Sequence, residues 1–191
     1  MAEWHRVKWS RAEQAVDRSF LAKTASVGTA DPKAAPPVFF GQLRDGGRSD
    51  LAVEFLAQAM PRLEAVVWAA DVVQDMSAAL PSEEADTLRT VFDWVAAPTE
   101  TSRRAAMDAA QRCEISAPAW LAAMAAFYSG GSVAPPDCDP LHPPPDATGR
   151  FAAGAILMVC ADLEDMEGAI DLCLMRGEGL ATQGLSVRGG R

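Results

Sequence analysis

The sequence predicts an all-α protein: a single compact domain of about seven antiparallel helices, with an N-terminal helical arm and a long proline-rich loop. Apolar residues recur at helical spacing between breaks marked by proline or glycine. Strict alternation is absent, and β-branched residues are sparse against an alanine background, so strands are not expected. Hydrophobic residues make up 49% of 191, which is enough for a hydrophobic core.

Residues 1–48 are predicted to form a helix followed by a linker, outside the main domain. The helix is expected from Trp9 to Ala22, with Ser10 as its N-cap. The linker is expected from Thr24 to Arg48, since residues such as Pro36-Pro37 interrupt helices. The apolar run at residues 38–40 inside this linker is expected to dock on the domain.

The main domain is predicted to span residues 49–185. Each helix start carries a proline or a residue suited to cap a helix. These starts are Ser49, Pro61, Pro81-Ser82, Pro98-Thr99 and Ser116-Ala117-Pro118.

Two further helices are expected after the proline-rich loop. The first is an apolar helix from Phe151 to Ala161, and the last runs from about Glu164 to Met175. Gly177 and Gly179 are expected to end that last helix. Residues 186–191 are expected to form a frayed tail. Trp68, Trp94 and Trp120 are predicted to be core residues rather than a ligand cage.

The loop at residues 130–147 is the most unusual part of the sequence. Six prolines between residues 132 and 146 exclude a helix there. Long loops in compact domains are commonly functional, and consecutive prolines favour a stiff polyproline II conformation that docks with little loss of entropy. The loop is therefore predicted to contact a partner protein, although it would also serve merely to connect and cover its own helices. The candidate interaction residues are Tyr128, Val133, Pro135, Pro136, Leu141, His142, Pro143, Pro144, Pro145 and Arg150.

No catalytic, cofactor or metal site is predicted. The sequence lacks a G-x-S-x-G nucleophile motif and a phosphate-binding P-loop, and it contains only two histidines. Asp137-Cys138-Asp139 with His142 offers ligand types that zinc accepts, but an exposed polar turn explains these residues better.

Acidic and arginine residues allow an enzyme as an alternative. Glu64, Asp71 and Asp75 fall near one helix face, and Arg103-Arg104 would suit an anionic group. A solvated helix face, and arginines that cover alanines or pair with neighbouring acids, are the simpler interpretation. A deep pocket lined by Glu64, Asp71 or Arg103 would favour an enzyme.

Composition also limits the binding partners and the cellular location expected of the protein. The formal net charge of −9 argues against nucleic acid as a partner. No secretory signal or membrane-spanning stretch is recognisable, so a cytoplasmic location without membrane insertion is expected. The four scattered cysteines are expected to be free thiols. The alanine-rich helices would pack equally well within one chain or across a homo-oligomer.

The main domain resembles a family of uncharacterised all-helical bacterial proteins, a domain of unknown function. The resemblance covers roughly residues 49–185, and no catalytic residues come with it. It implies an accessory role in bacterial secretion or signalling clusters, type VI secretion in particular. The segments that carry it are residues 55–68, Trp94–Pro98, Arg103–Ala106, Trp120–Ser132, Ala134–Pro136, Thr148–Arg150 and Gly154-Ala155.

Three functions follow, from different classes. The first is a non-enzymatic adaptor or structural accessory of a secretion-related assembly, with the proline-rich loop as its contact surface. The second is an immunity protein, because a small acidic helical domain suits a basic toxin. The third is an enzyme with an unrecognised carboxylate and arginine site.

Overall fold

The computed structural model describes residues 3–17 and 29–185, and within these ranges it contains nine helices and no strand. The predicted all-α class is therefore confirmed. Seven of these helices lie in the main domain. The helices are α1 (Glu13–Val16), α2 (Pro36–Asp45), α3 (Ser49–Ala59), α4 (Arg62–Met76), α5 (Ser82–Ala96), α6 (Glu100–Ala110), α7 (Pro118–Phe127), α8 (Ala147–Ala161) and α9 (Met166–Gln183).

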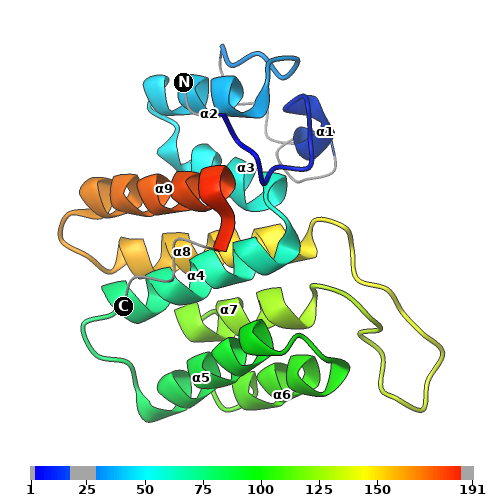
Figure 1. The fold of residues 1–191 in the computed structure, drawn as a ribbon. Helices are drawn as coiled ribbons and strands as arrows, with labels where there is room; N and C mark the ends of the chain where they lie inside the picture. Colours follow the sequence, from blue (N-terminus) through cyan, green and yellow to red (C-terminus); the bar gives the residue numbers. More distant parts are fainter. Residues whose placement is uncertain (1–2, 18–28, 186–191) are drawn as a thin grey trace.

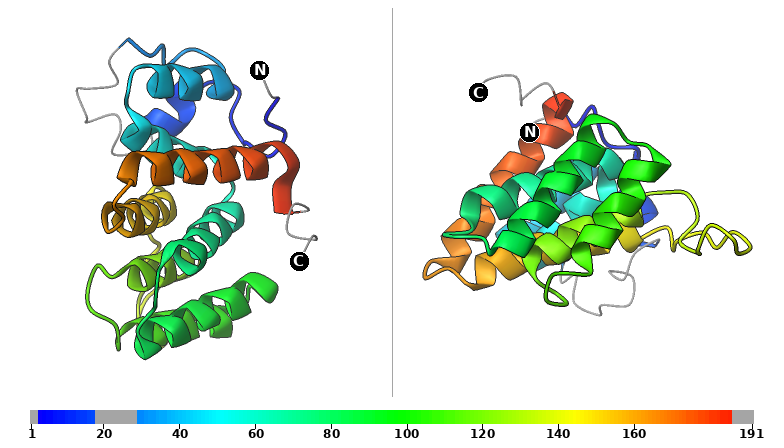
Figure 2. Two further views of the ribbon diagram at one scale, coloured as in Figure 1. Left: turned by 90° about the vertical axis from the view of Figure 1, so that its left-hand side faces the viewer. Right: turned by 90° about the horizontal axis from the view of Figure 1, so that it is seen from below.

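The helices are stacked in layers, with α8 near the middle (Figure 1). Helix α8 packs against α3, α4 and α7, and α5 and α6 lie beyond α7. On the other side, α9 contacts α3, α4 and α8, and α1 and α2 pack on α3. Figure 2 shows the same order from two further directions. The N-terminal helices and the α5–α6 pair therefore lie at opposite ends of the stack.

Small residues make the close packing around α8 possible. Five alanines of α7 are buried, and Ala152, Ala153 and Ala155 of α8 are buried as well. Larger side chains, among them Trp68, Phe55 and Ile156, fill the remaining space of the core. Trp94 is also buried and Trp120 half-buried, so the tryptophans contribute to the core as predicted.

The predicted linker at Thr24–Arg48 is wrong for residues 36–45, which form α2. Pro36-Pro37 starts this helix instead of interrupting it. Ala35 before them is extended, and the first helical positions need no N–H donor, so proline is tolerated there. The apolar run does dock on the domain, because Phe39 and Phe40 are buried and Phe39 packs edge-on against Phe55 at 4.8 Å.

The first predicted helix is also corrected. Helix α1 starts at Glu13 instead of Trp9, and its N-cap is Ala12 instead of Ser10. The side chain of Gln14 accepts hydrogen bonds from the backbone N–H groups of Ser10 and Arg11, at 3.1 and 3.0 Å, so this stretch is a turn. The later part of the prediction, from residue 18 to Ala22, lies outside the described residues.

The helix starts in the main domain follow the predicted breaks. Pro61 and Pro81 are the N-caps of α4 and α5, and Pro118 is the first residue of α7. Thr99 and Ser102 form a reciprocal capping box at the start of α6. Helix α8 starts at Ala147, four residues before the predicted Phe151.

The predicted end of the last helix is wrong. Helix α9 continues through Gly177 and Gly179 to Gln183 and is capped by Gly184, which has a φ of 72°. Gly177 lies where α9 meets α3 and α4: a Cβ atom there would come within 2.7 Å of the side chains of Leu56 and Trp68. Gly177 thus permits close helix packing, and α9 ends where Gly184 adopts a positive φ, which glycine tolerates without steric cost.

The described N-terminal residues are docked on the main domain. The N–H of Arg6 donates to the carbonyl of Ala181 at 2.9 Å, and its guanidinium pairs with the buried Glu64 at 2.7 Å. The ring of Trp4 packs edge-on against Phe40 at 5.1 Å. These contacts place Lys8 and Trp9 against the end of α3.

All four cysteines are free, as predicted. Cys160 of α8 and Cys173 of α9 are buried with their sulfur atoms 3.6 Å apart. Their mutual hydrogen bond and their burial raise the pKa of Cys173.

In the described ranges, every helix is too short or too polar to cross a membrane.

Candidate functional site

The connection between α7 and α8, residues 128–146, is the candidate site and is called the proline loop here. It runs outward from the helices and doubles back, as Figure 1 shows in yellow. The N–H of Val133 donates to the carbonyl of Leu141 at 2.8 Å, and the N–H of Leu141 donates to the hydroxyl of Ser132 at 3.0 Å. A turn closed by the N–H of Cys138 and the carbonyl of Pro135 reverses the chain. The loop is therefore an ordered hairpin.

Two arginines of α6 hold the outgoing arm of the proline loop. Arg103 is almost fully buried and donates to the carbonyl oxygens of Phe127 and Ser132, the latter at 2.7 Å. Arg104 donates to the carbonyl oxygens of Ser132 and Ala134, at 3.1 and 3.0 Å. The prolines leave backbone carbonyls without helical partners, and these guanidinium groups satisfy several of them.

Glu100 orients both arginines. Its carboxylate accepts two hydrogen bonds from Arg103, at 2.8 and 2.9 Å, and one from Arg104 at 2.7 Å. Burial alone would raise the pKa of Glu100, but the hydrogen bonds and charges of the two arginines outweigh it and lower the pKa below 4.5. The negative charge therefore persists at neutral pH and fixes the two arginines for the loop.

Two further side chains hold the ends of the proline loop. Arg62, the first residue of α4, donates to the carbonyl of Ser129 at 2.7 Å. Gln58 of α3 donates to the carbonyl of Asp146 at 2.9 Å. Side chains from α3, α4 and α6 thus fix the loop at both of its ends.

Aromatic packing supports the base of the loop. Tyr128 is half-buried, and its ring lies 5.3 Å from Phe127 and 5.1 Å from Phe151. The hydroxyl of Thr148 donates to the carbonyl of Tyr128 at 3.1 Å. The guanidinium of Arg103 lies over the ring of Phe127 at 4.7 Å. Tyr128 therefore helps to hold the loop at its base.

The far part of the loop is open to solvent. Leu141 is 61% exposed. His142 is exposed as well, and its Nδ1 lies 3.3 Å from the carbonyl of Gly131. Of the other predicted interaction residues, Val133 and Pro143 are half-buried, and Pro135, Pro136, Pro144, Pro145 and Arg150 are exposed.

A groove of about 590 Å³ separates the proline loop from α6. Pro135, Pro136 and Pro140 line it on the loop side. Arg104 and Asp108 line it on the helix side. Sequence reasoning missed this half of the site, although it singled out the Arg103-Arg104 pair, because only the fold brings α6 beside the loop.

The other candidate groups do not converge on one site. Arg103 and Arg104 both pair with the neighbouring Glu100, which agrees with the simpler of the two interpretations of these arginines. They also bind the proline loop. Glu64 pairs with Arg6, and Asp75 pairs with Arg176 at 2.9 Å. Arg150 lies 3.9 Å from Asp146, just beyond the loop.

The four residues whose types zinc accepts lie on the outer part of the loop. Asp137, Cys138, Asp139 and His142 are all exposed there. Within residues 3–17 and 29–185, no three His, Cys, Asp or Glu side chains are grouped to hold a metal ion.

Comparison with known proteins assigns the chain to a family. No curated protein and no solved structure matches the chain. The model of a family of unknown function, DUF6931, matches residues 39–181. That match extends from α2 into α9 and includes the whole proline loop and the three arginines that hold it. Because it spans well over half of the sequence, the chain belongs to the DUF6931 family of unknown function.

Proposed function

We propose that this protein is a non-enzymatic interaction protein, an adaptor or structural accessory, and that the proline loop is its contact surface. The observation that carries the proposal is the contrast within the loop. Its ends are fixed by Arg62, Arg103 and Arg104, whereas its far part is exposed and ordered.

Order in an exposed loop favours binding, because the entropy of fixing the loop is lost during folding and not during association. Six side-chain hydrogen bonds from the surrounding helices reach backbone carbonyls of the proline loop. Arginine is suited to this task because its planar guanidinium donates to more than one carbonyl at once. Arg103 does so from a buried position, with Glu100 fixing its orientation.

The chemistry of the exposed part fits a partner with an apolar contact patch. Leu141 and the ring faces of Pro135 and Pro136 offer apolar surface at low entropic cost. The groove beside them is edged by the charges of Arg104 and Asp108, which would set the orientation of the partner. A polar rim around an apolar centre is the usual composition of a protein interface.

The finer proposal is that the partner belongs to a bacterial secretion assembly of the type VI kind. It is supported by the resemblance of the main domain, which is in keeping with an accessory role. The partner's identity is the direct test of this part.

The test is affinity purification from the native cell followed by mass spectrometry. The tagged intact protein is compared with a version in which residues 133–145 are replaced by Gly and Ser. A sharper pair of variants is Leu141→Asp and Ile115→Asp. Ile115 is 76% exposed and lies outside the loop, so this pair places the same charge on two exposed apolar residues.

We expect the partner to co-purify with the intact protein and with Ile115→Asp. It should be lost with the replaced loop and with Leu141→Asp. Retention of the same partners by all four proteins would refute the loop as the contact surface. Components of a secretion assembly among the partners would support the finer proposal, and a single basic toxin would favour the immunity alternative instead.

A further inference from the structure

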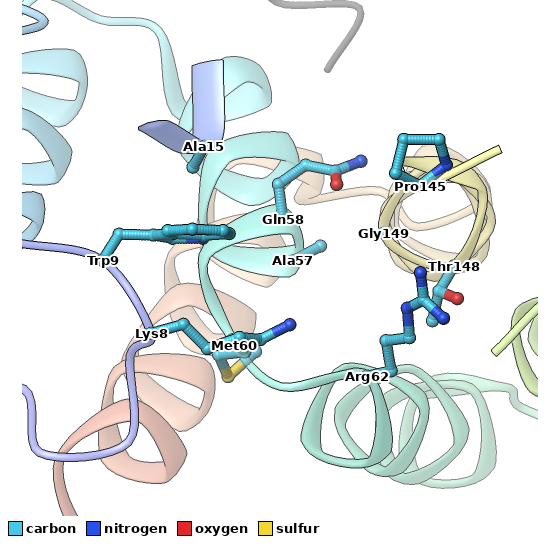
Figure 3. Close-up of a pocket in the computed structure, with 10 residues that line it drawn as sticks. All are labelled: Lys8, Trp9, Ala15, Ala57, Gln58, Met60, Arg62, Pro145, Thr148 and Gly149. Carbon is cyan, nitrogen blue, oxygen red and sulfur yellow. The ribbon is translucent and has the colours of Figure 1, made fainter. Parts of the chain in front are cut away.

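The returning arm of the proline loop, residues 139–144, is extended and has a proline pattern of its own. These residues form no helix, strand, turn or bend. Pro140 and Pro143 enclose two other residues, and two more prolines follow directly. The last of these, Pro145, lines a cleft of about 230 Å³ beside Gln58 of α3 (Figure 3). The returning arm is therefore a P-x-x-P segment that ends where the chain meets the helices again.

Local sterics and two hydrogen bonds fix the backbone of the returning arm. Proline locks its own φ at about −65° and forces the residue before it out of the α region. Leu141 alone has no proline at its own position or directly after it. Its carbonyl accepts from the N–H of Val133 at 2.8 Å, and its N–H donates to the hydroxyl of Ser132 at 3.0 Å. The whole arm is thus restrained to the extended region, where successive prolines adopt polyproline II.

Two faces of the returning arm are open to a partner. Polyproline II has about three residues per turn, so side chains three positions apart share a face. Leu141 and Pro144 share one face, and both are exposed. His142 on the next face is exposed as well. The third face is the one nearest the protein, because Pro143 is half-buried and Pro140 lines the groove along α6.

The backbone of the returning arm offers free hydrogen-bond acceptors. Along the part of the chain that the structure describes, no N–H or O–H donates to the carbonyl oxygens of Pro140, His142 or Pro143. Tryptophan and tyrosine each combine a flat apolar ring with one polar donor. Such a side chain packs against a proline ring and donates to a neighbouring carbonyl at the same time. The arm therefore suits a groove lined by these two residue types.

Two carboxylates lie at the start of the returning arm. Asp137 and Asp139 are exposed, and among the described residues neither pairs with a basic side chain. A lysine or arginine at one end of the partner's groove would pair with them. This charge complementarity would set the direction in which the arm lies in the groove.

We propose that the returning arm binds a groove on a partner protein that is lined by tryptophan and tyrosine and edged by a basic residue. This inference rests on the proposed function, since it names the kind of partner that the proline loop would contact. Leu141 and Pro144 pack against the aromatic rings, and the carbonyl of His142 accepts from a ring donor. Because the arm is fixed before it binds, little conformational entropy is lost on association.

The test uses the full chain, with isolated SH3 and WW domains as probes. Both kinds of domain bind proline-rich segments in aromatic-lined grooves. Each isotope-labelled domain is titrated with the unlabelled protein, and NMR follows the indole N–H of the tryptophan in the groove of the domain. We expect this signal to move for at least one domain of the panel, with a dissociation constant of about 1 mM or lower.

A pair of double variants tests the exposed face. Leu141→Ala with Pro144→Ala removes both of its side chains and should weaken binding about tenfold or more. Position 144 stays restrained in this variant, because Pro145 still follows it. Ile115→Ala with Pro98→Ala is the matched control, since both residues are exposed and lie outside the loop. The control should bind as the intact protein does.

A charge variant tests the basic edge of the groove. Asp137→Asn with Asp139→Asn should weaken binding about threefold at low salt and less at high salt, because salt screens exposed charges. Binding that moves the groove indole and is weakened by both double variants of the loop supports the proposal. No movement of any groove indole at about 1 mM protein, or equal binding by Leu141→Ala/Pro144→Ala and its control, would overturn it.

Co-purification from the native cell separates the failure of this inference from the failure of the proposed function. If the replaced loop loses the partner while Leu141→Ala/Pro144→Ala retains it, the loop is the contact surface but does not bind in this way. If the replaced loop also retains the partner, the proposed function fails with it.

Discussion

The glycine at position 177 should be essential for the packing of α9, and substitution by alanine tests this. A Cβ atom at Gly177 would lie 2.7 Å from the Cδ2 atom of Leu56 and 2.7 Å from two ring carbons of Trp68. The indole cannot easily move, because it is buried and its Nε1 donates to the carbonyl of Cys173 at 3.0 Å. Alanine gains about 1 kcal/mol over glycine from helix propensity, but overpacking a core costs about 1–3 kcal/mol.

Gly179→Ala is the matched control, two residues further along the same helix. A Cβ atom at Gly179 meets nothing within 4 Å, so this variant should gain up to about 1 kcal/mol. We therefore expect Gly177→Ala to be less stable than Gly179→Ala by about 1–3 kcal/mol, or roughly 2–12 °C in Tm at about 2–4 °C per kcal/mol. Urea and thermal unfolding measure both. If the two variants proved equally stable, the close contact of α9 with Trp68 would be refuted.

Three further predictions concern the loop supports and the thiols. Arg103→Met should cost about 2–4 kcal/mol and speed amide hydrogen exchange in the proline loop, since it leaves the buried carbonyl of Phe127 unpaired and removes one of the two arginine donors to Ser132. Arg89→Met, at an exposed ion pair, should change stability by less than about 0.5 kcal/mol. The pKa of Glu100 is lowered in the folded protein, so its contribution to the free energy of unfolding is complete above pH 4.5 and is lost as the pH falls through the lowered value. Thermal melts across acidic pH should show this loss of stability in the intact protein and not in Glu100→Gln. In labelling with a thiol reagent, Cys138 should react at once, while Cys160 and Cys173 react only on unfolding, because they are fully buried; fast labelling of all four would contradict their burial.

Local signals in the sequence predict most of the helices. Proline at a helix start, a capping pair such as Thr99 with Ser102, and apolar residues at helical spacing act within a few residues, so they are visible without a structure. The same signals mislead where one residue type has two roles. Pro36-Pro37 is compatible with a break or a first turn, and the packing of Phe39 and Phe40 against the domain selects the first turn.

Half of the candidate site could also be predicted. The prolines identify the loop, because they exclude a helix over a long stretch. The arginines that hold the loop could not be assigned, since a basic residue on a helix is compatible with many partners. Arg62 and Arg103 lie 67 and 24 residues from the carbonyls of Ser129 and Phe127 that they bind.

The sequence by itself determined the helical class, most helix starts, and the existence of an exposed, proline-stiffened loop, because short-range sterics and hydrogen bonding decide these features. Only the tertiary structure decided that α9 runs through Gly177, that three arginines fix the loop, and that Lys8 and Arg62 line one cleft (Figure 3). Each of these depends on groups brought together from distant parts of the chain, and no local pattern encodes which helix face will lie against which neighbour.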